Sequence, residues 1–152
     1  MLRSRIGTVF QDFKLLLTRT VFENVAVPLQ VMNLKDAQIA KEVFEVLEKV
    51  GLSDKANSFP LELSGGEVQR TSIARAIIAK PEVLLAEEPT GDLDPDNARE
   101  VVKLLEKINE EDKTIIMMAP HNAHIVNEFR KRVVVIEKGK VEKDEKEGKY
   151  EN

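Results

Sequence analysis

The sequence has no cysteine, no excess of basic residues and no long hydrophobic run. The lack of cysteine excludes disulfides and thiolate metal sites, and it fits a reducing compartment. Lys and Arg number 23 against 27 for Asp and Glu, so the net charge is −4 and nucleic-acid binding is not expected. No apolar run reaches about 18 residues, and residues 1–5 lack the apolar core of a secretory signal. We expect one globular domain that does not cross a membrane.

The most informative segment is Leu-Ser-Gly-Gly-Glu-Val-Gln-Arg at residues 63–70. Ser64 and Glu67 have the spacing of a capping box, which predicts that a helix begins at Ser64. Apolar residues then recur at helical spacing through position 78. Gly65 and Gly66 have no side chains, so we expect free backbone N–H groups and the positive end of the helix dipole to face outward. This arrangement predicts an anion site that suits a phosphate.

Three short apolar runs each lead into polar residues that suit a ligand site. They are residues 6–10 before Gln11, residues 83–86 before Glu87 and Glu88, and residues 114–119 before His121. Such runs are typical of buried parallel strands, which bring polar residues to the carboxyl edge of a sheet where α/β proteins bind ligands. The fold class predicted is α/β, with a mostly parallel sheet flanked by helices.

Helix signals lie between and after these strands. Thr20 and Glu23 form a second capping box, which opens a short helix that Pro28 interrupts or ends. Asp36 is expected to cap a further helix, with Gly51 as its stop. Asp94 is expected to cap a helix that has Pro95 in its first turn.

The C-terminal part of the chain is predicted to be simpler. Residues 133–136 form a last apolar strand, and a tight turn leads into a weak final strand. Residues 143–152 are nearly all charged, which predicts a solvated, flexible tail after a domain that spans residues 1–142.

Taken in order, these motifs closely resemble those of the ATP-binding-cassette (ABC) ATPases across nearly the whole chain. Gln11 matches the Q-loop, residues 63–70 the signature, Glu87 and Glu88 the Walker B strand, Asp94 the D-loop and His121 the H-loop. Chance occurrence of all five in this order is very unlikely, although any single short motif is a weak signal. The resemblance implies a P-loop NTPase-like fold with an inserted helical subdomain at residues 12–62.

The resemblance also implies a role for each matching residue. In the family, two domains enclose two ATP molecules head to tail, so Ser64, Gly65 and Gly66 would contact the γ-phosphate of a nucleotide held by a second domain. The other matching residues are Glu67, Gln69 and Asp94 toward the nucleotide, Glu88, His121 and Gln11 for catalysis, and Glu87 with Gln11 for Mg²⁺. The implied cofactors are therefore ATP and Mg²⁺.

The sequence departs from the family pattern in three ways. Glu87 stands where the family normally has Asp, and Pro120-His121-Asn122 replaces the usual Thr-His-Asp. The phosphate-binding pattern G-x-x-x-x-G-K-[ST], called Walker A, occurs nowhere in the sequence. We therefore expect an incomplete domain that lacks the Walker A strand, loop and helix, with two strand edges exposed. We expect this chain alone not to hydrolyse ATP.

The residues around Gln11 narrow the resemblance. Residues 10–16 and 20–25 are most similar to the FtsE branch of cell-division ATPases. The lipoprotein-release and macrolide-export branches share much of the same sequence in these segments. The implied partners are a second nucleotide-binding domain and an integral membrane permease or FtsX-like subunit, and the implied location is the inner face of the cell membrane. Two functional classes stay open: an ATPase component of an ABC system, and a catalytically inactive remnant or non-catalytic binding module.

Overall fold

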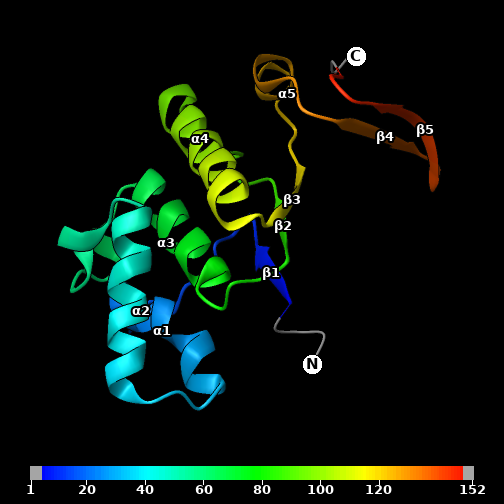
Figure 1. Cartoon of the computed structure of the whole chain (residues 1–152). Helices are drawn as coiled ribbons and strands as arrows, with labels where there is room; N and C mark the ends of the chain where they lie inside the picture. The colour runs from blue at the N-terminus through cyan, green and yellow to red at the C-terminus, as the bar shows by residue number, and fades with distance from the viewer. Residues whose placement is uncertain (1–4, 149–152) are drawn as a thin grey trace. The chain divides into compact units, whose positions relative to one another are not determined.

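A computed structural model describes residues 5–148 of the chain. These residues form two compact units, one ending at Ala119 and one beginning at Pro120, and each is described by itself. The first unit contains β1 (Ile6–Val9), α1 (Val21–Val31), α2 (Asp36–Lys49), two short 3-10 helices (Ser53–Lys55 and Pro60–Glu62), α3 (Gly65–Ile77), β2 (Val83–Glu87), α4 (Pro95–Asp112) and β3 (Ile115–Ala119) (Figure 1). The second unit contains α5 (Ala123–Phe129), β4 (Val133–Glu137) and β5 (Lys140–Glu145).

The first unit is built on a three-stranded parallel sheet in the order β1-β2-β3. Val9 is paired with Ala86 across the first ladder, and Glu87 with Ala119 across the second. All three strands therefore end at one edge, as the sequence predicted for an α/β fold. Within the described residues β3 pairs only with β2, so its other side is an edge of the sheet.

Helices pack on one face of this sheet, and the other face is exposed. Side chains alternate between faces along a strand, and one set packs under α3 and α4, which lie on the same side of the sheet (Figure 1). This covered face consists of Val9, Leu84 and Ala86, which are at most 3% exposed, with Ile116 and Met118 partly buried beside them. The open face consists of Ile6, Leu85, Ile115 and Met117, and Met117 is 61% exposed. Burial of the strands is therefore one-sided.

The helices α1 and α2 confirm some predictions and correct others. The capping box of Thr20 and Glu23 is present at the start of α1. The prediction that Pro28 interrupts or ends this helix is wrong, because α1 runs unbroken through Pro28 to Val31. Asp36 is not the cap of α2: Lys35 holds the extended cap conformation, and Asp36 is the first helical residue, where its charge favours the helix dipole.

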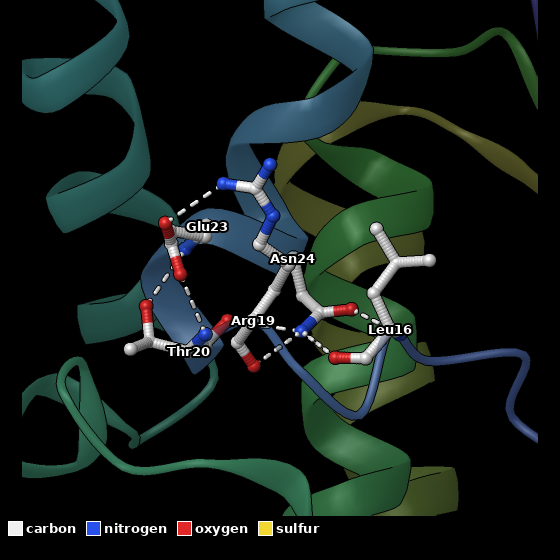
Figure 2. Close-up of polar contacts among 5 residues, drawn as sticks. All are labelled: Leu16, Arg19, Thr20, Glu23 and Asn24. Carbon is white, nitrogen blue, oxygen red and sulfur yellow. Dashed lines mark hydrogen bonds and ion pairs between the residues drawn. The ribbon is translucent and has the colours of Figure 1, made fainter.

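The segment that enters α1 is fixed by one buried amide. The side chain of Asn24 accepts a hydrogen bond from the Leu16 amide at 2.7 Å and donates to the carbonyls of Leu16, Arg19 and Thr20 at 2.9–3.0 Å (Figure 2). Glu23 joins the same group by pairing with Arg19 at 3.0 Å. The irregular segment before α1 has backbone groups that no helix or strand pairs, and the Asn24 side chain pairs several of them and holds the segment to α1.

The second unit corrects the predicted tail. Residues 143–145 belong to β5, which pairs with β4 in antiparallel fashion, and Arg132 pairs with Asp144 at 2.7 Å. The Gly148 amide also donates to the Lys131 carbonyl at 3.2 Å. Charge alone misled the prediction, because a two-stranded ribbon can present charged side chains on its exposed surface. Residues 149–152 of the predicted tail lie outside the described residues.

Candidate nucleotide site

The start of α3 has the geometry that the sequence predicts. Ser64 is the N-cap, and its Oγ accepts a hydrogen bond from the Glu67 amide at 3.4 Å. The Glu67 carboxylate accepts in return from the Ser64 amide at 2.8 Å and from the Ser64 hydroxyl at 2.9 Å. The bond from the Ser64 amide is the main reason that the pKa of Glu67 lies below its usual range, and Lys55 at 3.4 Å adds to the effect. The predicted capping box is confirmed.

Two backbone amides at this helix start lack an acceptor among the described residues, one in exposed Gly65 and one in buried Gly66. The first amides of a helix have no acceptor within the helix, and that of Glu67 is already taken by Ser64. Within residues 5–148, the amides of Gly65 and Gly66 have no hydrogen-bond acceptor. Gly65 is exposed, and a Cβ added there would meet only Leu93, at 3.5 Å. The signature end of α3, meaning Ser64, Gly65 and Gly66, therefore fits an anion that accepts from amides at the positive end of a helix.

Asn97 joins this helix start to the start of α4, and the sequence analysis did not single it out. Asp94 caps α4 by accepting from the amides of Asp96 and Asn97, each at 3.1 Å. The Asn97 side chain donates to Asp94 at 2.5 Å, which is the main cause of the lowered pKa of Asp94. A Cβ added at Gly66 would lie 2.5 Å from the Asn97 Oδ1 atom, so Gly66 permits the close approach of the two helix starts. The only sequence signal for Asn97 was its place in the first turn of a capped helix.

Gln11, Glu87 and Glu88 emerge at one edge of the sheet. Gln11 comes shortly after β1, Glu87 is the last residue of β2 and Glu88 follows it, and the register of β1 with β2 brings the strand ends level. Glu88 is half-buried in a left-handed conformation with φ 46°. Its amide donates to the Ala119 carbonyl of β3 at 3.1 Å, and its carbonyl accepts from the Gly91 amide at 3.1 Å. Such backbone strain is typical of functional positions, and here neighbouring backbone groups on both sides hold Glu88 in place.

The same edge offers few protein ligands for a metal ion. Glu87 and Gln11 are both exposed and present oxygen atoms, the ligand type that Mg²⁺ prefers. Among the described residues no group of three or more His, Cys, Asp or Glu side chains could hold a metal. The donor set fits Mg²⁺ only if water and phosphate oxygens complete the octahedron, which is the usual way that proteins bind this ion.

Two predicted site residues differ in placement from the others. His121 is exposed and lies in the unit that begins at Pro120. Asn122, next to it, caps α5 by accepting from the His124 amide at 2.9 Å. Gln69 is only 1% exposed, so its side chain does not face a ligand at the surface in this conformation. The expectation that Gln69 contacts a nucleotide is therefore not met by this arrangement.

A shallow groove of about 410 Å³ lies along the outer edge of β1. Its lining includes Phe10 and Lys14 from the segment after β1, Pro28 of α1, and Arg75 of α3. Arg75 donates to the carbonyls of Phe13 at 2.7 Å and Lys14 at 2.6 Å, and burial lowers the pKa of its guanidinium. The groove is therefore mainly apolar, with two basic side chains beside it.

Comparison with known proteins assigns the family. The ABC transporter family model matches residues 1–91, which is more than half of the chain. The chain belongs to the ABC transporter family. It is 53% identical over 150 residues to the cell division ATP-binding protein FtsE of Streptococcus pneumoniae, covering 99% of this chain and 65% of the relative. It is 54% identical over 148 residues to the FtsE protein of Bacillus subtilis, covering 97% of this chain and 64% of the relative.

Solved structures of the ABC transporter family confirm the fold class. The cbiO1 protein of Clostridium perfringens, part of the ABC transporter complex cbiONQ, superposes with a TM-score of 0.87 at 32% identity, over 95% of this chain and 58% of cbiO1. The bacterial ABC transporter cassette MJ0796, solved as a dimer, gives 0.80 at 35% identity, over 97% of this chain and 65% of the cassette. This chain thus spans about 65% of the length of the FtsE relatives. No helix among residues 5–148 is both long and apolar enough to cross a bilayer.

Proposed function

We propose that this chain acts as an ATP-binding and ATP-hydrolysing component of an ABC membrane system of the FtsE type. The observation that carries the proposal is the signature end of α3, where a capped helix presents two amides without acceptors beside an exposed glycine. The FtsE relatives are named as ATP-binding proteins, and the MJ0796 cassette was solved with ADP and Pi. These relatives give no support to the alternative of an inactive remnant.

The signature end of α3 completes the site of a second cassette. A γ-phosphate accepts hydrogen bonds from the amides of Gly65 and Gly66, and the helix dipole favours its charge. The hydroxyl of Ser64 donates to Glu67 in this structure, so it must turn from the Glu67 carboxylate before it can donate to a phosphate. Binding of the second cassette's nucleotide therefore competes with this bond between the Ser64 hydroxyl and the Glu67 carboxylate, and not with the two backbone bonds of the capping box.

The carboxyl edge of the sheet supplies the hydrolytic groups. Glu88 polarises the attacking water through its carboxylate, and Gln11 orients that water. His121 contacts the transferred phosphate. Asp94, in the D-loop, transmits changes between the two domains of the dimer. Glu87 and Gln11 would hold Mg²⁺, which neutralises phosphate charge when it is bound. The sequence contains no Walker A lysine, so we propose that this chain alone does not turn over ATP.

The membrane partner is a permease or an FtsX-like subunit, and the chain works at the inner face of the cell membrane. The segment that leads from β1 into α1 supports such a contact, because Phe10, which lines the groove, and Leu16 and Leu17, which do not, all have exposed apolar side chains. Residues 12–62 would form the helical subdomain that meets the partner.

The proposal is tested by nucleotide-dependent association. The chain is mixed with the Bacillus subtilis FtsE relative, altered so that it retains its phosphate loop but lacks a working signature, and sized with and without a non-hydrolysable ATP analogue. We expect a mixed dimer that needs nucleotide. Gly65→Asp should weaken it by at least roughly tenfold, because a carboxylate beside the γ-phosphate site repels the phosphate.

The matched control is Asn33→Asp, which adds the same charge in the exposed loop between α1 and α2. It should leave the mixed dimer unchanged. A dimer that forms equally well without nucleotide, or that is indifferent to Gly65→Asp, would mean that the motif only starts a helix.

A further inference from the structure

Lys55 reaches the signature end of α3 from another segment of the chain, and no sequence motif pointed to it. It ends the short 3-10 helix Ser53–Lys55, and its Nζ lies 3.4 Å from the Oε1 atom of Glu67. The side chain of Lys55 is 35% exposed and that of Glu67 is 19% exposed, so water reaches this ion pair only in part. A partly shielded pair of charges beside the proposed phosphate site is expected to influence the ligand that binds there.

The backbone that carries Lys55 is fixed against the start of α1. Ala56, the next residue, is 6% exposed, and its carbonyl accepts a hydrogen bond from the Phe22 amide at 2.9 Å. The Ser58 carbonyl accepts from the Val21 amide at 2.8 Å. Both donors lie in the first turn of α1, where an amide has no acceptor within its own helix, so these bonds satisfy groups of both segments. Lys55 is therefore presented to α3 from a fixed backbone.

The two oxygens of the Glu67 carboxylate have different partners. Oε2 accepts from the amide and the hydroxyl of Ser64, at 2.8 and 2.9 Å, and Oε1 faces Lys55. When the Ser64 hydroxyl turns to a phosphate, the carboxylate loses one donor, and two negative groups then share one helix start. The Ser64 amide and the Lys55 ammonium remain as partners of Glu67 among the described residues. Of these two, only the ammonium offsets the negative charge.

We propose that Lys55 is a positioning residue that holds the Glu67 carboxylate while the Ser64 hydroxyl contacts the phosphate of a second cassette's nucleotide. Without Lys55, the carboxylate retains the hydroxyl more strongly and repels the phosphate. This inference rests on the proposed function, because it needs a nucleotide at the signature end. An ion pair with this exposure contributes little to the stability of the free chain, so its loss is expected to alter binding and not unfolding.

The first test replaces Lys55 in the whole chain and uses the mixed dimer with the altered Bacillus subtilis relative. The concentration of a non-hydrolysable ATP analogue that gives half of the dimer is measured by sizing. Lys55→Gln should raise this concentration by at least about threefold, and Lys55→Arg, which keeps the charge, should restore it to within about 1.5-fold of wild type. No effect of Lys55→Gln, or no rescue by Lys55→Arg, would overturn the inference. So would a fall of more than about 4 °C in the melting temperature of free Lys55→Gln, since Lys55 would then support the fold.

The second test asks whether Lys55 acts through Glu67. In a Glu67→Gln chain there is no carboxylate charge to hold, so adding Lys55→Gln should raise the half-saturating concentration by less than about 1.5-fold. An equal loss with and without Glu67 would mean that Lys55 attracts the phosphate directly, and it would overturn the inference. Glu67→Gln by itself should need no more nucleotide than wild type, because its uncharged side chain does not repel the phosphate. A weaker dimer for this variant would contradict the proposal as well.

Lys41→Gln is the matched control, because it removes the same charge from an ion pair on a different helix. Lys41 lies 3.8 Å from Glu45, and both are exposed residues of α2. This variant should leave the half-saturating concentration unchanged, and a loss equal to that of Lys55→Gln would show that only the net charge of the chain matters. If the wild-type chain forms no nucleotide-dependent dimer, the proposed function fails and the inference falls with it. If that dimer forms and is indifferent to Lys55→Gln, only the inference fails.

Discussion

The covered and open faces of the three-stranded sheet are made by the same strands, yet they have opposite surroundings. On β2, Leu84 is fully buried under the helices, whereas its neighbour Leu85 is 38% exposed. On β3, Met117 is 61% exposed while the flanking Ile116 and Met118 pack against the core. Apolar sequence alone therefore does not tell which side of a strand is covered. The position of α3 and α4 decides it.

The largest effect that this comparison predicts is a difference between two large-to-small substitutions. Leu84→Ala removes side-chain volume from the covered face and should lower the free energy of unfolding by about 2–5 kcal/mol. Met117→Ala on the open face should change it by less than about 0.5 kcal/mol. Urea unfolding followed by circular dichroism measures both. Similar losses in the two variants would show that the open face is packed in solution.

A smaller loss in the free energy of unfolding is expected for a substitution in α1, which packs mainly on α3, one layer away from the sheet. Asn24→Ala leaves backbone groups of Leu16, Arg19 and Thr20 without their side-chain partner, so it should cost about 2–3 kcal/mol. Gln30→Ala, at an exposed site on the same helix, should be nearly neutral. Urea denaturation of both variants measures the two free energies of unfolding. An Asn24→Ala chain as stable as the Gln30→Ala chain would mean that the covering layer does not depend on this amide.

The smallest effect concerns the cap of α3, the helix that covers β1. Hydrogen bonds from Ser64 lower the pKa of Glu67 in the folded chain, so its contribution to stability is complete above about pH 4.3, the ordinary value for glutamate. The contribution is lost as the pH falls through the folded pKa. Glu67→Gln can keep the capping box but cannot titrate, and it should remove this part of the acid dependence.

Melting temperatures of wild type and Glu67→Gln at neutral and acidic pH would measure this contribution. The two curves should diverge near neutrality and approach each other at low pH. Curves that stay parallel across this range would show that the Ser64 bonds do not stabilise the charged form of Glu67.

The sequence predicted those features that depend on neighbours along the chain. The capping boxes of Ser64 and Thr20 and the stop at Gly51, with φ 70°, depend on local spacing and were confirmed. The cap of α2 was misplaced by one residue, because Lys35 takes the extended conformation although Asp36 has the better side chain for a cap. Sequence spacing carries no information on which backbone position the tertiary packing selects.

The parts of the site that escaped prediction depend on contacts between distant segments. Asn97 matters because α4 brings it against Gly66, and the local sequence around Asn97 does not show this approach. Gln69 was expected at the ligand because it belongs to the signature motif, but the second turn of α3 points it into the core. A motif identifies residues of one segment, whereas the packing of that segment decides which of them reach the surface.

The left-handed residues of this chain have a consequence for its denatured ensemble. Among residues 5–148, only Gly51 and Gly139 are glycines with positive φ, whereas eight other residues have it, Lys80, Lys113 and Lys138 among them. Each lysine stores some strain in the native backbone, but a glycine would give the denatured chain many more conformations to lose. The unfolded chain is thus stiffer and loses less entropy on folding, and strain in the native state offsets part of the stability gained in this way.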